Sequence, residues 1–152
     1  MTATPLTTAQ TAAVAALVAA GRLRQVNPDV NRASAFISQA RDRLSQLPLL
    51  TSDPVRYTLA YDAAHDIGEA LLAAYGYRTA SGPGHHDALG RYITIVIDAP
   101  PTAVTAAAAW DHHRRARNDQ NYRAAPVGAA QVVAVEQFAR ALLDAATHRG
   151  IT

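Results

Sequence analysis

The sequence predicts an all-α protein that folds as an antiparallel helical bundle. Apolar residues recur at intervals of three and four in several segments, and proline and glycine mark the ends of those segments. No segment looks like a strand that has a partner to pair with. The 152 residues suffice for one compact domain and are too few for two ordinary ones. We therefore expect a single domain over residues 1–152, with a short polar lead at residues 1–6.

Capping residues predict the first two helices. Thr7, with Gln10 three residues later, has the pattern of a capping box, so the first helix should start there and continue through Leu23. Asn27 followed by Pro28 predicts the restart of the chain as a second helix. The apolar residues of that helix fall on one face: Val30, Ala33, Ile37, Ala40, Leu44 and Leu47.

The middle of the chain predicts two further helices around one long loop. Ser52-Asp53-Pro54 opens the third helix, and Gly76 is placed to cap its end. Residues 77–84 are rich in Ser, Gly and Pro and predict a loop. Residues 85–98 include β-branched residues, but a lone strand would have no partner, so we expect a helix there.

Two helices complete the predicted bundle of six. Pro100-Pro101 breaks the chain, and a helix is expected from Thr102 to near Tyr122. The last helix should run from about Pro126 to Gly150. Its predicted inward face consists of Val127, Ala130, Ala134, Phe138, Ala141, Leu142 and Ala145.

Composition excludes several classes of protein. The chain has no cysteine, which excludes disulfides, thiolate zinc sites and a cysteine nucleophile. Its 14 basic residues are all arginine and face 12 acids, so the net charge of +2 does not by itself indicate nucleic-acid binding. The 35 alanines and the absence of lysine suit a GC-rich genome. No apolar run could span a membrane and no leader peptide is apparent, so we expect a soluble cytoplasmic protein.

The densest polar cluster runs from Trp110 to Arg123, after an alanine-rich stretch. His113 lies one helical turn before Arg117, so both side chains should approach one anion. Guanidinium, amide and imidazole groups together suit a phosphodiester. The alternative is a solvated helix end whose cations are stabilised by the helix dipole. Helical spacing divides the cluster into one face with Arg114, Arg117 and Asn121 and a second with Asp111, Arg115, Asn118 and Tyr122.

A second polar set forms a stripe on the third predicted helix. Its members, spaced by three or four residues, are Asp62, His65, Asp66 and Glu69. We expect a solvent face or, for Asp62 and Asp66, acids that orient the arginines of the later helix. The spacing matches no specific metal motif, so no metal and no cofactor are predicted. His85 and His86, after the Gly-rich loop, are expected to be a cap and a surface residue.

Two stretches taken together resemble the HEPN domain family. The run from Tyr61 to Arg78, followed by Gly-His-His-Asp-Ala-Leu, resembles the core helix and following turn of HEPN domains. The run from Arg114 to Tyr122 is similar to the Arg-Asn motif of the family. The resemblance covers roughly residues 29–146 and is strongest to small stand-alone bacterial proteins, including actinobacterial ones.

The resemblance implies an all-α bundle, commonly a homodimer whose motif helices build one composite groove. Active members are metal-independent ribonucleases in which the motif Arg binds the scissile phosphate. A His four to six residues later helps proton transfer as the ribose 2′-hydroxyl attacks. Many members belong to toxin–antitoxin or defence systems, some beside a nucleotidyltransferase. Others have lost the nuclease motif and bind RNA or nucleotides.

This chain departs from the active motif. None of the five residues after Arg117 is His, and Tyr122 stands at the fifth position. Tyrosine is a poor general base at neutral pH, because its ordinary pKa is near 10. We therefore expect an RNA- or nucleotide-binding module. It should form a homodimer, and its protein partner should be an antitoxin or a nucleotidyltransferase. The alternatives are a metal-independent endoribonuclease toxin that uses Arg117 with His113 or Tyr122, and a dimerisation module that binds only protein. The predicted binding residues are Arg114, Arg117, Asn118, Asn121 and Tyr122, with Asp62 and Asp66 beside them.

Overall fold

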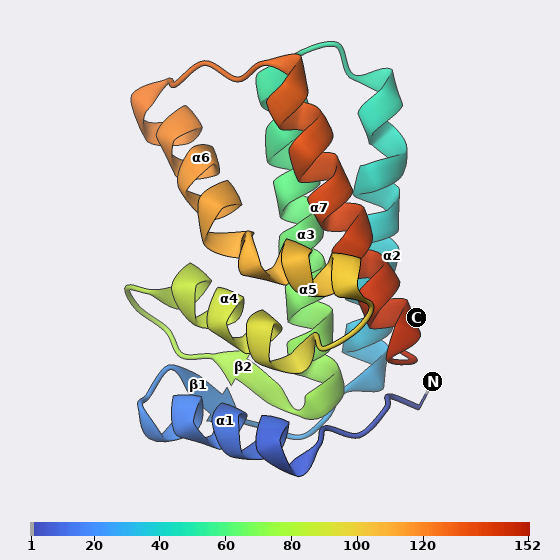
Figure 1. The fold of residues 1–152 in the computed structure, drawn as a ribbon, viewed down its shortest axis with the longest axis vertical. Coiled ribbons are helices and arrows are strands. Elements are labelled where there is room, and N and C mark those ends of the chain that lie inside the picture. The colour runs from blue at the N-terminus through green and yellow to red at the C-terminus, as the bar shows by residue number, and fades with distance from the viewer. Residues whose placement is uncertain (1) are drawn as a thin grey trace.

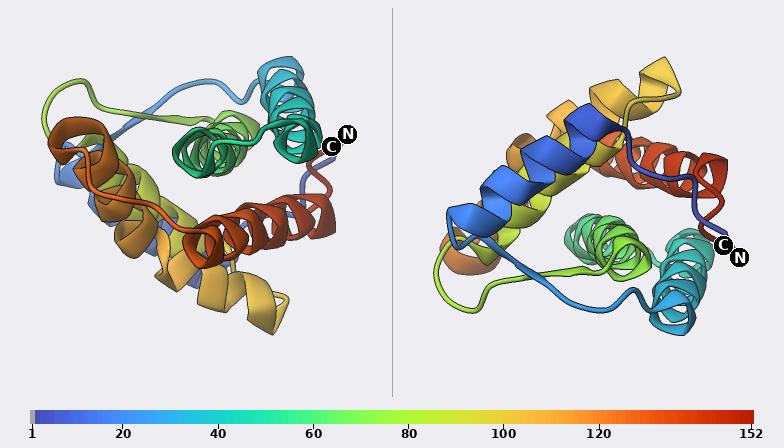
Figure 2. Two further views of the ribbon diagram at one scale, coloured as in Figure 1. Left: turned by 90° about the horizontal axis from the view of Figure 1, so that it is seen from above. Right: turned by 90° about the horizontal axis from the view of Figure 1, so that it is seen from below.

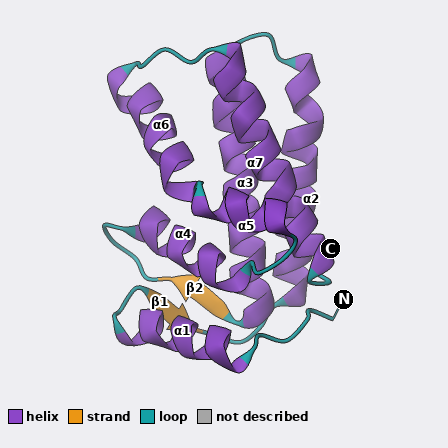
Figure 3. Cartoon of the chain, in the orientation of Figure 1, coloured by secondary structure: helices purple, strands orange, loops and turns teal. Residues whose placement is uncertain are grey.

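A computed structural model describes residues 2–152 and shows a helical protein (Figures 1 and 3). Over these residues no helix combines the length and the hydrophobicity that a membrane crossing requires. The described chain contains seven α-helices, a 3₁₀ turn and a two-stranded ribbon. They are α1 (Thr8–Ala19), β1 (Leu23–Gln25), α2 (Val30–Gln46), the 3₁₀ turn η1 (Leu47–Leu49), α3 (Asp53–Tyr75), β2 (Tyr77–Thr79), α4 (His85–Val96), α5 (Pro101–Ala108), α6 (Trp110–Arg123) and α7 (Ala129–His148).

Helix α3 is the centre of the bundle, which confirms the predicted all-α class. It packs most extensively against α2 and α7, and most of its residues between Tyr57 and Ala74 are buried. α2 and α3 run antiparallel, as predicted (Figure 1). α7 runs in the same direction as α3, because α6 first carries the chain back to the end of the bundle where α3 begins (Figure 1). Seen from above, α2 and α6 flank α3 on different sides (Figure 2).

The first correction concerns the segment after α1. The predicted capping box at Thr7 and Gln10 is present, but α1 ends at Ala19 and does not reach Leu23. Gly21 stops the helix because it takes φ +73°, a conformation open to glycine, and its N–H donates to the Val18 carbonyl. Leu23 instead begins β1, where its side chain is buried.

A small β-ribbon is the second correction, because no strand was expected. β1 pairs antiparallel with β2, so that Leu23 faces Thr79 and Arg24 faces Arg78. Each strand has three residues, too few to show an alternating pattern in the sequence. The ribbon brings the end of α1 beside the segment that follows α3, within what was predicted as a loop (Figure 1).

The last third of the chain is divided differently from the prediction. The helix expected from Thr102 to Tyr122 is two helices, α5 and α6, which meet at Ala109. Trp110, only 2% exposed, is held at the junction by its indole N–H, which donates to the His86 carbonyl at 3.0 Å. An alanine-rich sequence carries no local signal for such a break, because the contact that fixes it is tertiary.

Helix α7 begins at Ala129, and its buried face differs from the predicted one in the first half of the helix. Ala130 and Ala134 are exposed, whereas Val132 and Val135 are buried. The helix is apolar around much of its circumference, so two faces compete, and the one with the larger valine side chains buries more apolar area. Phe138, Leu142 and Ala145 are buried as expected.

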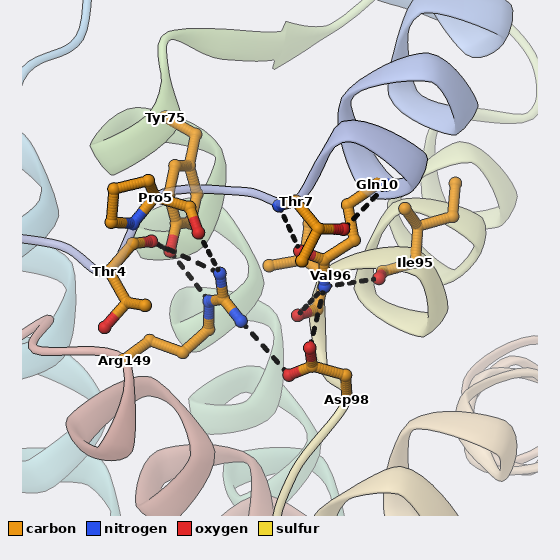
Figure 4. Close-up of polar contacts among 9 residues, drawn as sticks. All are labelled: Thr4, Pro5, Thr7, Gln10, Tyr75, Ile95, Val96, Asp98 and Arg149. Carbon is orange, nitrogen blue, oxygen red and sulfur yellow. Dashed lines mark hydrogen bonds and ion pairs between the residues drawn. The ribbon is translucent and has the colours of Figure 1, made fainter.

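Polar contacts tie both ends of the chain to the bundle (Figure 4). Arg149 is 5% exposed and donates to the Tyr75 hydroxyl at 2.7 Å, to Asp98 at 3.2 Å and to the Thr4 carbonyl at 3.2 Å. The amide of Gln10 donates to the carbonyl of Val96 at 3.1 Å and to Asp98 at 3.3 Å. The polar lead is therefore fixed at Thr4 against the end of α7.

Candidate functional site

The polar stripe of α3 forms the floor of an open groove of about 560 Å³. His65, Asp66 and Glu69 lie on this floor, so the structure brings together three of the four residues that the helical spacing placed in one stripe. The walls come from α2, from both strands of the ribbon and from the start of α4. The wall residues are Arg24, Arg32, Phe36, Arg78, Thr79, Ser81 and His85.

Three arginines give the groove positive charges, and Glu69 on its floor feels the charges of two of them, Arg32 and Arg78. Arg24 and Arg78 stand directly opposite each other on the antiparallel ribbon. Their like charges repel, which destabilises the ribbon when no anion is bound. Arg32, on α2, lies over the ring of Phe36 at 5.2 Å. Within residues 2–152 none of these three guanidinium groups forms an ion pair with a carboxylate.

Carboxylates hold two further arginines at the other end of the stripe. Arg43 of α2 donates to Asp66 at 2.8 Å and lies 3.7 Å from Asp62. Arg117 of α6 lies 3.9 Å from Asp62. Burial raises the pKa of both Asp62 and Asp66, and the neighbouring guanidinium groups act against that rise.

These contacts support one part of the sequence prediction and correct another. Asp62 does connect α3 to an arginine of α6, as expected. Asp66 instead binds the α2 side chains of Arg43 and Gln39, the latter at 3.0 Å. Because Asp66 faces α2, it does not orient the arginines of α6.

Three histidines meet beside this stripe. One ring nitrogen from each of His65, His85 and His86 lies within 4.8 Å of the other two. Nδ1 of His85 is 2.7 Å from the Thr79 hydroxyl, and Nδ1 of His86 is 3.3 Å from the Tyr61 hydroxyl. All three imidazoles are half-buried. His85 and His86 are therefore neither a helix cap nor plain surface residues, contrary to the prediction from the sequence. Gly84 occupies the capping position of α4.

The environment of the three imidazoles keeps protons off two of them. Burial, together with the positive charges of nearby groups such as His86 and Arg117, lowers the pKa of His65 to about 4. Burial also lowers the pKa of His86. Nε2 of His65 is buried and has no hydrogen-bond partner among the described residues.

The predicted binding residues of α6 are not gathered at one point. Arg117 is turned toward α3, with its guanidinium over the Tyr61 ring at 5.7 Å and its Nε buried without a hydrogen-bond partner among residues 2–152. Arg114 pairs with Asp111 of its own helix, and Asn118 is half-buried. Asn121 and Tyr122 are exposed near the end of α6, the latter at 81%.

His113 has a structural environment. It is 6% exposed, its ring packs against Phe138 at 4.4 Å between centroids, and its Nδ1 lies 3.1 Å from the Tyr57 hydroxyl. Burial lowers the pKa of His113 to about 4, with a smaller contribution from His112. His113 is therefore not accessible to an anion beside Arg117, contrary to the prediction from the helical spacing.

Sequence reasoning missed several residues that line the groove or contact the α3 stripe. Arg32, Gln39 and Arg43 are spaced by seven and four residues on α2, so a polar face of that helix was a usable signal. Arg24 and Arg78 gave none, because they become neighbours only when the unpredicted ribbon forms.

No protein-family model matches this chain, and searches of the curated proteins and of the solved structures find no significant match. The resemblance to HEPN domains therefore stays a prediction. The basis for a function is the chemistry of the groove.

Proposed function

We propose that this protein binds the phosphate groups of RNA or of a nucleotide in the groove beside α3. The observation that carries the proposal is the opposed pair Arg24 and Arg78, together with Arg32, in a groove that also holds Glu69 but where none of the three forms an ion pair among residues 2–152. An anion bound between these guanidinium groups would relieve their mutual repulsion. Arginine suits a phosphate because its planar fork donates two parallel hydrogen bonds.

The ligand extends, in this proposal, from the ribbon toward α6. Arg117 lies at the far end of the α3 stripe and would contact a second phosphate, as the resemblance to the HEPN motif implies. Phe36 gives the wall an aromatic ring on which a base can stack. The same resemblance points to RNA among polyanions, and to a role within a toxin–antitoxin or defence system.

Salt-dependent binding tests this proposal. A fluorescent single-stranded RNA and a labelled mononucleotide are titrated with protein between 50 and 200 mM salt. Replacing one phosphate-contacting arginine should reduce the slope of log affinity against log salt by about 0.7 for a single strand. We expect that reduction in Arg78→Gln and in Arg117→Gln.

The matched control is Arg140→Gln on α7, where the arginine pairs with Glu136 at 2.9 Å, away from the groove. It removes the same charge and should leave the binding curve unchanged. Equal losses in Arg78→Gln and Arg140→Gln would show only a general charge effect and would contradict the proposed site. Absence of binding at low salt would favour the alternative in which the arginines contact a protein.

The ribonuclease alternative is tested in the same samples by following RNA length in the presence of EDTA. If the wild type cleaves RNA and Arg117→Ala does not, the protein is a metal-independent ribonuclease and not simply a binding module. The predicted proton carriers are then separated by His113→Phe and Tyr122→Phe. Intact RNA throughout, with binding retained, supports the non-catalytic module.

Partners are part of the same proposal. The resemblance implies a homodimer, and an antitoxin or a nucleotidyltransferase as a second protein. Sedimentation equilibrium of the purified chain gives its mass in solution. A monomer at all concentrations would contradict the homodimer.

A further inference from the structure

The three histidines beside the α3 stripe come from two separate elements. His65 lies in the middle of α3, and His85 and His86 are the first two residues of α4. Their ring centroids are separated by 4.9 Å for His65 and His86, 5.9 Å for His65 and His85, and 5.1 Å for His85 and His86. Three imidazoles packed this closely and only half-buried have both the chemistry and the access that a bound ion requires.

We propose that His65, His85 and His86 form a binding site for a divalent transition-metal ion of the Zn²⁺ type. Three imidazole ligands with a fourth position open or held by a carboxylate are a common coordination set for zinc. Imidazole nitrogen favours zinc, copper and nickel over magnesium and calcium, which prefer oxygen. The proposal does not depend on whether the arginines of the groove bind RNA.

The three imidazoles are close together but more widely spaced than the ligands of a bound zinc ion. Nitrogen ligands of a tetrahedral zinc, each at 2.0–2.1 Å, lie roughly 3.3 Å from one another. Here one nitrogen of each ring lies within 4.8 Å of the other two. A bound ion would therefore draw the three nitrogens together by up to about 1.5 Å.

The hydrogen bonds around the site orient the rings. The hydroxyls of Thr79 and Tyr61 lie beside Nδ1 of His85 and of His86, and each can accept the Nδ1 proton. Nε2 of each ring is then left with a lone pair for a metal. Such hydrogen bonds to the second nitrogen are a regular feature of metal-binding histidines.

His65 supplies an independent observation. Its Nε2 is buried and has no hydrogen-bond partner within residues 2–152, which is costly for a buried polar atom. A metal ion would satisfy that nitrogen.

The charges around the site are mixed, because Arg24, Arg32 and Arg78 line the same groove as His65 and His85. Arg43 and Arg117 approach the site, but each faces a carboxylate, Asp66 and Asp62 respectively. Glu69 carries a further negative charge, with Oε1 4.0 Å from Nε2 of His85. Glu69 is therefore placed to neutralise a bound ion or to act as its fourth ligand.

Metal titration tests the site directly. The full chain is treated with EDTA, desalted and titrated with Zn²⁺ in competition with a chromophoric chelator. We expect one tight equivalent of zinc, and with Co²⁺ the visible absorption of a tetrahedral complex. In His65→Gln and in His86→Gln the zinc affinity should fall at least tenfold and the cobalt absorption should be lost.

The control is His112→Gln, because His112 is an exposed histidine outside the cluster. It should keep the wild-type affinity. Tyr61→Phe keeps the buried ring while removing the hydroxyl beside His86, so it covers the case in which a histidine variant fails to fold; its affinity should fall about tenfold. The proposal is overturned if the wild type binds no stoichiometric zinc, or if His65→Gln and Tyr61→Phe bind it as tightly as His112→Gln.

Discussion

At the scale of single residues, burial determines what the histidines can do. His113 lies between Tyr57 and Phe138, so its charged form would lose the solvation that water provides. The same residue type at positions 65, 85 and 86 is half-buried, and His65 and His85 line a groove where a ligand can reach them. The spacing of residues in the sequence does not distinguish a buried histidine from an accessible one, whereas the tertiary structure does.

The buried state of His113 predicts a loss of stability in acid. Its pKa is about 4 in the folded protein and near 6.5 in the unfolded chain, so the unfolded state takes up the proton first as the pH falls. The contribution is complete above pH 6.5 and is lost between pH 6.5 and pH 4, by up to about 3 kcal/mol. Urea denaturation across this range should show a shallower loss in His113→Phe than in the wild type. Identical slopes would show that His113 is accessible to protons in the folded protein.

At the scale of the elements, α4 has a position that matters for the site. Its first turn carries two of the three clustered histidines, and its middle is clamped by Trp110 at the start of α6. Trp110 lies directly on Gly90, where a methyl group would stand 2.3 Å from the ring atom Cδ1. Trp110, the residue at the junction of α5 and α6, is thus also the residue that holds α4 in place.

Gly90→Ala should therefore destabilise the protein. The added methyl group overlaps the indole ring, so that either the ring or α4 must shift, at a cost of about 1–3 kcal/mol. In a Trp110→Ala background the ring atoms that the methyl group would meet are absent, and the same substitution should cost less. Thermal and urea unfolding of the four proteins in this double-mutant cycle measure the difference. Additive effects would mean that the close approach is not what excludes a side chain at position 90.

At the scale of the whole molecule, the two ends of the chain close the structure. Arg149 connects the end of α7 to Tyr75 on α3, to Asp98 after α4 and to the carbonyl of Thr4 (Figure 4). One buried guanidinium thus joins four segments that are far apart in the sequence. A terminal arginine of this kind looks like an ordinary helix-end charge until the fold is known.

Replacing Arg149 tests this role. Arg149→Met keeps an unbranched apolar side chain but removes the guanidinium donor from the Tyr75 hydroxyl and from Asp98, and leaves the Thr4 carbonyl with the Tyr75 hydroxyl alone. This should cost about 2–3 kcal/mol of unfolding free energy. Arg149→Lys should recover only part of that loss, because an ammonium group cannot reproduce the planar fork. Full recovery by lysine would indicate that the charge alone matters. Chemical denaturation, with hydrogen exchange at the N-terminal segment, gives both readouts.

The sequence by itself determined the class of the fold and most of its helices. Periodic apolar residues and caps act within one turn or two, so the start of α1 at its Thr7 cap and the end of α3 at Gly76 followed from local chemistry. The polar stripe of α3 followed from the same periodicity. The tertiary structure alone decided which residues complete the site, because Arg24 meets Arg78, and His65 meets His85 and His86, only after segments distant in sequence have packed. The helical spacing within α3 predicts the residues on the floor of the groove. The walls come from other elements, which that spacing does not describe.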